Sequence, residues 1–208
     1  KVLVYLLSNV TDGLVLIGGS LIFGLPLPLN ALQILWVNFF TDSFPAVSFA
    51  FEKEPGGLAH KPHKGRPKLF YPLMRFLILV IGLSTSVLLF VLYFALTRMG
   101  YDEALVRTFT FAAFGTYTLL VALSVRSLDK SILTYPLFSN PYLTGSIIIG
   151  FGLMAAAIYH PWLQPIFDTV NLPFGWVTGV LLVGILNIIL IEISKRLFSR
   201  PLLFIRKA

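Results

Sequence analysis

The chain lacks cysteine altogether, has few charged residues, and shows neither an internal repeat nor a low-complexity segment. The absence of cysteine excludes disulfides and thiolate metal sites. Charged residues make up only 12% of the chain, whereas ordinary soluble domains contain about 25%. The composition is therefore unlike that of a soluble globular protein.

Hydrophobic residues, in contrast, make up 57% of the 208 residues, and the mean hydropathy is +0.86. Several apolar stretches reach the length that crosses a bilayer as a helix, about 20 residues. The sequence predicts an all-α, polytopic membrane helix bundle of six transmembrane helices in a lipid bilayer. No soluble domain fits between them, so residues 1–208 are predicted to form one transmembrane domain. The predicted spans are residues 2–23, 30–51, 72–97, 105–125, 142–159 and 174–198.

The basic residues indicate an orientation for these spans. The net charge of +7 does not indicate nucleic-acid binding, because the charges lie in loops and not on a soluble aromatic-basic surface. All basic residues except Arg98 and Arg107 fall on one side of the predicted topology. Since basic residues are enriched in cytoplasmic loops, both termini are predicted to be cytoplasmic. The residues on that side are Lys1, Lys53, Lys61, Lys64, Arg66, Lys68, Arg75, Arg126, Lys130, Lys195, Arg196, Arg200, Arg206 and Lys207.

Two acidic residues, Asp12 and Asp42, lie inside the first two spans. A carboxylate at the centre of a membrane helix costs about 2.5–3.5 kcal/mol on insertion scales, so it needs a partner, a proton or an ion. Asn9 lies three residues before Asp12, and Asn38 and Thr41 share a helical face with Asp42 at i, i+3 and i+4 spacing. If the two polar stripes face each other, their oxygens surround one cavity.

An all-oxygen set of this kind suits hard cations such as calcium and, less strictly, magnesium, manganese or sodium. Pro45 follows in the second span and removes one helical hydrogen bond, which frees backbone carbonyls. Asn9 or Thr41 alone would be better explained as hydrogen bonding between helices. Two acids with no basic residue at the centre of any span favour ion or proton handling.

Glycines recur in the later spans, and a glutamate lies near the end of the last one. The glycines predict close helix packing. Glu192 is predicted to pair with Lys195 or Arg196, which follow at i+3 and i+4. The glycine positions are Gly82, Gly145, Gly150, Gly152, Gly179 and Gly184.

These residues resemble the last six membrane helices of P-type cation-transporting ATPases, in particular the calcium-pump-like branch. The resemblance covers residues 1 to about 200. The family's sixth helix carries a specific Leu-Trp-Val-Asn-x-x-Thr-Asp-x-x-Pro-Ala motif, and its fifth a Ser-Asn-Val-x-Glu-like motif. The matching segments are Ser8-Asn9-Val10, Leu35-Trp36-Val37-Asn38, Thr41-Asp42 and Pro45-Ala46, followed by a basic, proline-containing loop at 52–67 and by Arg126–Ser131 and Phe138–Tyr142.

The resemblance implies a set of cation ligands. Asn9 and Asp12 match the ligands of the family's fifth helix, and Asn38, Thr41 and Asp42 match those of its sixth. Asp12 is one methylene shorter than the usual glutamate. Thr118 stands where calcium pumps place a glutamate ligand on the eighth helix. Calcium remains the expected transported cation, with manganese, sodium or another cation as alternatives. Thr118 weakens the case for two calcium ions, so a single site or a different cation stays open.

The resemblance also implies parts that these residues do not contain. The family's Asp-Lys-Thr-Gly-Thr phosphorylation motif and its fourth-helix proline-glutamate motif are absent from the sequence. We therefore expect a C-terminal piece of a bacterial or archaeal plasma-membrane pump, whose partners are the N-terminal helices and cytoplasmic domains. ATP and magnesium would act only in the full-length pump, and this piece should not hydrolyse ATP alone. The loop at 52–67 would contact the phosphorylation domain.

Two other functions remain open on the sequence. One is a standalone secondary transporter or relay bundle that uses Asp12 and Asp42 to move protons or cations. The other is a non-catalytic remnant. A remnant should tolerate Asp12→Asn and Asp42→Asn, whereas a transporter or pump should not.

Overall fold

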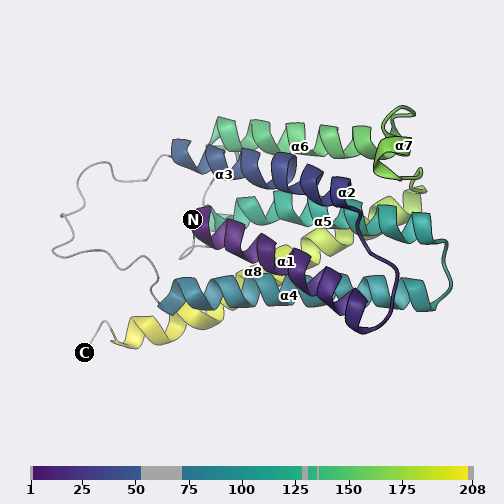
Figure 1. Ribbon diagram of the computed structural model, residues 1–208. Coiled ribbons are helices and arrows are strands. Elements are labelled where there is room, and N and C mark those ends of the chain that lie inside the picture. Colours follow the sequence, from purple (N-terminus) through teal and green to yellow (C-terminus); the bar gives the residue numbers. More distant parts are fainter. Residues whose placement is uncertain (1, 53–71, 128–130, 135, 206–208) are drawn as a thin grey trace.

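The structure of the protein, a computed structural model, describes residues 2–52, 72–127, 131–134 and 136–205. Within these residues every regular element is helical, and the long helices lie side by side in a bundle (Figure 1). The long elements are α1 (Val2–Ile22), α4 (Pro72–Arg98), α5 (Glu103–Val125), α6 (Pro141–Tyr159) and α8 (Phe174–Ile205). Short elements are α2 (Ala31–Trp36), η1 (Val37–Ser43), α3 (Phe44–Ser48), η2 (Phe49–Phe51), η4 (Ile132–Thr134) and α7 (Gln164–Phe167).

The all-helical membrane architecture is confirmed. In the described part of the chain, five helical stretches are long and apolar enough to cross a membrane: Val2–Ile22, Ala31–Phe51, Glu103–Val125, Pro141–Tyr159 and Phe174–Arg196. In α4 the stretch that qualifies as apolar, Gly82–Arg98, is shorter. A sixth span at α4 therefore stays a prediction, although every predicted span coincides with helix.

Side-chain caps set where three of the helices begin. Asn30 forms a capping box with Gln33 at the start of α2, and Asp102 accepts from the Leu105 N–H at the start of α5. Asn140 caps α6 by accepting from the N–H groups of Tyr142 and Leu143. Such caps satisfy backbone donors that have no partner within the helix.

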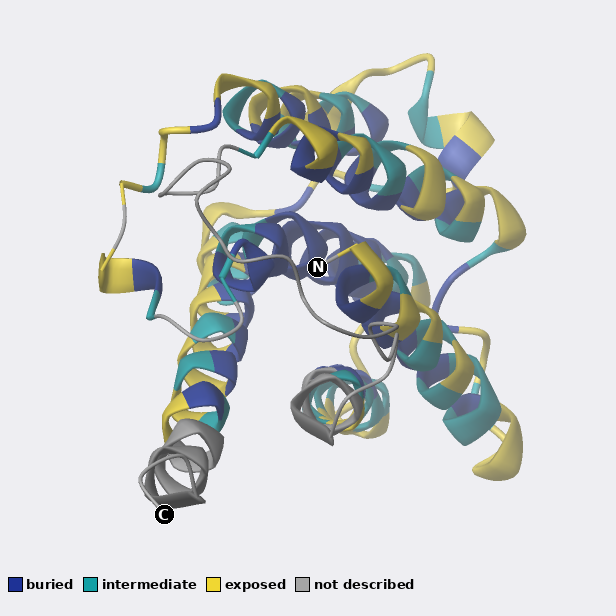
Figure 2. Ribbon diagram, turned by 90° about the vertical axis from the view of Figure 1, so that its left-hand side faces the viewer, coloured by how far each residue is buried: buried dark blue, intermediate teal, exposed yellow. Residues whose placement is uncertain are grey.

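The bundle has two groups of helices. One group consists of the second span, from α2 to η2, and α6. The other consists of α1, α4, α5 and α8, in which α1 packs mainly on α4, and α5 on α8. The second span packs on α6 and also on α5. Figure 2 shows α2, α3 and α6 as one layer above the other long helices, with buried residues on the faces that meet. α5 is buried along most of its length and joins the two groups. The faces turned outward carry exposed apolar side chains, as expected for helices in lipid.

Gly82 brings α4 close to α1. A Cβ at this position would lie 3.1 Å from the Thr11 Cβ and 3.3 Å from the Ser8 carbonyl oxygen. Predicted close packing is likewise confirmed at Gly150, Gly179 and Gly184, where a Cβ would meet a side chain of α5. The prediction was wrong at Gly145 and Gly152, because a Cβ there would meet open space within the described part of the chain. Sequence alone could not show which helix face these two glycines occupy.

We expect Gly82→Ala to lower the free energy of unfolding by about 1–3 kcal/mol, because the added methyl group pushes α4 away from α1. Gly152→Ala is the matched control, since it adds the same methyl group on an open helix face. Thermal unfolding of the purified protein in detergent compares the two. Equal midpoints for both variants would contradict the close approach.

Candidate cation site

The second span changes helix type around its acidic residue. Val37–Ser43 is π-helical, and α3 and a turn of 3₁₀ helix follow it. π-helical turns are rare and frequently lie at functional sites. Both Thr41 and Asp42 belong to this turn and are buried. Pro45, four residues after Thr41, has no N–H to donate to the Thr41 carbonyl in the α-helical pattern.

Tyr5 donates a hydrogen bond to the Thr41 carbonyl, which receives none from Pro45 because proline has no N–H. Its hydroxyl lies 2.8 Å from the Thr41 carbonyl oxygen and 3.1 Å from that of Thr118. The Tyr5 side chain is fully buried. One hydroxyl therefore connects α1 to the π-helical turn and to α5.

Asp42 faces α1 across the boundary between the two groups of helices. Asp42 is 5% exposed, and its carboxylate accepts a hydrogen bond from the Asn9 Nδ2 at 3.1 Å. The amide oxygen of Asn9 is buried and has no hydrogen-bond partner among the described residues. A buried polar atom without a partner is uncommon and calls for an explanation such as an ion or a water. Here the oxygen without a partner belongs to the same side chain whose nitrogen donates to the buried Asp42 carboxylate.

Asp12 has a different environment. Its Oδ1 accepts from the hydroxyls of Thr85 and Ser86, each at 2.6 Å, and its Oδ2 accepts from the Tyr117 hydroxyl. In the described part of the chain, no ion pair joins Asp12 or Asp42 to a basic side chain. Asp12 is thus compensated by hydroxyl donors from α4 and α5, whereas Asp42 has one amide donor.

The other three predicted ligands lie around this pair without joining its hydrogen bonds. Asn38 is exposed in the described structure, and its carbonyl accepts from the Ser43 hydroxyl. The hydroxyls of Thr41 and Thr118 donate to carbonyls of their own helices, those of Val37 and Phe114. The structure therefore brings together Asn9 and Asp42, with Asp12 held separately.

Four further residues of this region were not predicted from the sequence. These are the hydroxyl donors Tyr5, Thr85, Ser86 and Tyr117. A run of three hydroxyl residues at 84–86 inside an apolar span was the available signal for two of them. The sequence carries no such signal for Tyr5 or Tyr117, because the rotation of the helix decides whether an aromatic hydroxyl points inward.

The donor set fits a hard cation better than a transition metal. Among the residues that the structure describes, no group of three or more histidine, cysteine, aspartate or glutamate side chains comes together. The available groups are carboxylate, amide and carbonyl oxygens, which suit calcium and similar ions.

Comparison with known proteins gives the family. The sequence pattern described as "Cation transporting ATPase, C-terminus" matches residues 26–197. The chain belongs to this family. The resemblance to the C-terminal membrane segment of a calcium-pump-like ATPase is thereby confirmed.

Individual relatives agree with the family match. The chain is 33% identical over 183 residues to a calcium-transporting ATPase of Bacillus subtilis, covering 85% of this chain and 20% of that protein. It is 34% identical over 170 residues to the calcium-transporting ATPase type 2C member 2 of Mus musculus, covering 80% and 18%. The chain thus spans about a fifth of the length of these curated relatives.

The predicted docking loop lies largely outside the described residues, since the structure describes only Glu52 of residues 52–67. Residues 128–130 of the second matching loop also lie outside them. The predicted ion pair of Glu192 is confirmed, because Lys195 Nζ lies 2.7 Å from its carboxylate.

We expect Tyr117→Phe to lower the free energy of unfolding by about 1–3 kcal/mol, because the buried Asp12 carboxylate loses a donor. Tyr142→Phe is the control, since the Tyr142 ring is exposed and stacks on Phe51, a contact that phenylalanine keeps. Thermal unfolding midpoints measure both. A Tyr117→Phe midpoint equal to that of the control would show that the hydroxyl does not support Asp12.

Proposed function

We propose that this chain is the ion-binding transmembrane domain of an ATP-driven cation pump, with calcium as the transported substrate. The observation that carries the proposal is a buried amide oxygen on Asn9, the side chain whose nitrogen donates to Asp42. This oxygen has no hydrogen-bond partner among the described residues. Residues 1–208 form this domain, and α4 supplies the sixth span. Membership of the family and the calcium-transporting relatives support the substrate class.

The energetics favour a bound cation between α1 and the second span. An unpaired carboxylate at membrane depth costs about 2.5–3.5 kcal/mol, and one amide donor compensates Asp42 only partly. A cation would accept electron density from the Asp42 carboxylate and from the Asn9 amide oxygen together. Asp42 is therefore the most important ligand in this proposal, and Asn9 is its first partner.

The remaining ligands complete the proposed shell. Asp12 reaches a cation only when its carboxylate exchanges some of its three hydroxyl donors for the ion. Thr41, Thr118 and Asn38 contribute hydroxyl, carbonyl or amide oxygens after rotation away from their present partners. Because Asp12 is already well compensated, the arrangement favours one cation over two.

ATP coupling belongs to the remainder of the full-length pump. ATP and magnesium act on a phosphorylation domain, and residues 52–67 contact that domain from the cytoplasmic side. Both termini lie in the cytoplasm, and the membrane is a bacterial or archaeal plasma membrane. This chain alone does not hydrolyse ATP.

One observation favours a second function, a proton or cation relay. Asp12 is surrounded by the hydroxyls of Thr85, Ser86 and Tyr117, which can pass a proton as donors and acceptors in turn. A relay would not need ATP. ATP-dependent calcium uptake into vesicles that contain the full-length protein distinguishes a pump from a relay.

We expect Asp42→Asn to lower calcium affinity about a hundredfold or more, because the substitution removes the charge that attracts the ion. Equilibrium binding of radioactive calcium to the full-length protein in detergent measures the effect. Asp168→Asn is the control, since Asp168 pairs with Arg107 and is exposed.

Retained wild-type calcium affinity in Asp42→Asn would refute the site. Loss of affinity in the Asp168→Asn control as well would show that binding responds to charge in general and not to Asp42.

A further inference from the structure

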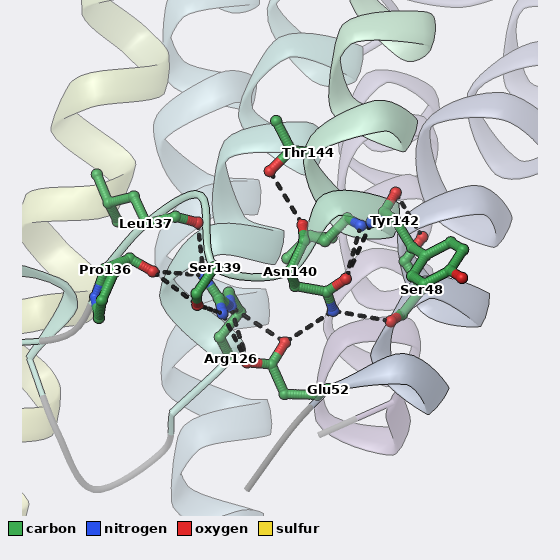
Figure 3. Close-up of polar contacts among 10 residues, drawn as sticks. Ser48, Glu52, Arg126, Pro136, Leu137, Ser139, Asn140, Tyr142 and Thr144 are labelled. Atoms are coloured by element: carbon green, nitrogen blue, oxygen red, sulfur yellow. Dashed lines mark hydrogen bonds and ion pairs between the residues drawn. The ribbon is translucent and has the colours of Figure 1, made fainter. Parts of the chain in front are cut away.

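A second buried polar cluster lies at the end of the second span, away from the candidate cation site. Its centre is the guanidinium group of Arg126, whose side chain is 3% exposed. Arg126 Nη2 donates to the Glu52 carboxylate at 2.6 Å, and Nε donates to both Glu52 oxygens at 3.2 Å. Figure 3 shows Glu52 between Arg126 on one side and Asn140 on the other.

The other donors of Arg126 hold the loop between α5 and α6. Nη1 donates to the Pro136 carbonyl at 3.1 Å and to the Leu137 carbonyl at 2.5 Å. Nη2 also reaches the Ser139 hydroxyl at 2.6 Å. The fork geometry of a guanidinium makes these contacts possible together, which a lysine could not reproduce.

Asn140 connects the same cluster to α6 and to the second span. Its Nδ2 donates to the Glu52 carboxylate at 2.9 Å and to the Ser48 carbonyl at 3.0 Å (Figure 3). Its Oδ1 caps α6. The last two turns of the second span are thus tied to the ends of α5 and α6.

The opposite end of the second span is fixed in a similar way. The side-chain amides of Asn30 and Gln33 donate to the Phe167 carbonyl at 2.9 and 3.0 Å. Both ends of the span are therefore attached to the α5–α7 region. Between them lie the π-helical turn and Pro45, the part of the span with the least regular backbone.

Asp42 lies between these two attachments, in the π-helical turn, and faces Asn9 of α1. Glu52 lies ten residues after Asp42, directly after the continuous run of helical turns that ends at Phe51. Without Arg126, the Glu52 carboxylate would lose its charged partner and favour water at the membrane edge. The 3₁₀ turn would move with it, and the π-helical turn would absorb the change by rotating.

We propose that Arg126 is a positioning residue for the cation site: through Glu52 and Asn140 it fixes the rotation of the second span and so sets cation affinity. This inference rests on the proposed function, because it requires that Asp42 bind a cation. A purely structural anchor would change stability and the amount of active protein, but not the calcium concentration that gives half-saturation.

The test is calcium binding and calcium-activated ATP hydrolysis in the full-length protein with Arg126→Gln. We expect the half-saturating calcium concentration to rise roughly tenfold, the usual effect of removing a group that orients a metal ligand. The maximal rate per folded molecule should change little. Glu52→Gln, which keeps the hydrogen-bonding shape, should give a smaller rise, and Arg126→Lys should rescue part of the affinity.

Arg107→Gln is the matched control. Arg107 lies in α5 and pairs with two carboxylates, Glu103 and Asp168, at the opposite end of the helix from Arg126, which follows its last residue. An unchanged half-saturating concentration in folded Arg126→Gln would overturn the proposal, and so would an equal rise in Arg107→Gln.

Two further results separate the remaining cases. If Arg126→Gln does not fold, Glu52→Gln and Asn140→Ala carry the test, and wild-type affinity in either folded variant would overturn the proposal. If the wild-type protein binds no calcium, or Asp42→Asn binds it normally, the proposed function fails first. Wild-type binding that depends on Asp42 but not on Arg126 refutes the positioning role alone.

Discussion

The structure depends on one constraint: two carboxylates lie buried in membrane-spanning helices, and in the described part of the chain no basic side chain pairs with either. The protein meets this constraint in two different ways. Asp12 receives three hydroxyl donors from neighbouring helices, so its charge is spread over α4 and α5. Within the residues that the structure describes, Asp42 receives one amide donor, and the oxygen of the same amide has no partner. The first arrangement stabilises the bundle, and the second leaves the Asp42 carboxylate less compensated.

Asp12 and its donors lie within one group of helices, whereas Asp42 lies where the two groups meet. α1 and α4 approach closely at Gly82, which brings Thr85 and Ser86 to Asp12. The second span forms the other group with α6, and polar contacts at its two ends attach it to Phe167 of α7 and to Arg126 after α5. Asn9 and Asp42 meet where these groups face each other, and Tyr5 adds a second link nearby. Small movements between the groups would therefore change the distance between the proposed ligands while Asp12 keeps its hydroxyl donors.

Hydropathy predicted the helices well, because a membrane span needs a long apolar run and prolines and caps mark its ends. The helical spacing that grouped Asn38, Thr41 and Asp42 was less reliable. It assumed an α-helix, whereas the turn is π-helical and its i→i+5 bonding places more residues in each turn. Asn38 is exposed while Thr41 and Asp42 are buried. The partners of Asp12 depend on how three helices rotate against one another, which a single sequence does not specify.

The position of a bound cation in the full-length protein tests the central claim most directly. Anomalous diffraction from crystals grown with calcium would locate the ion without any assumption about its ligands. The account predicts a calcium ion about 2.3–2.6 Å from the Asn9 amide oxygen and from an Asp42 carboxylate oxygen. An ion bound elsewhere, with the Asn9 amide nitrogen still donating to Asp42, would contradict it.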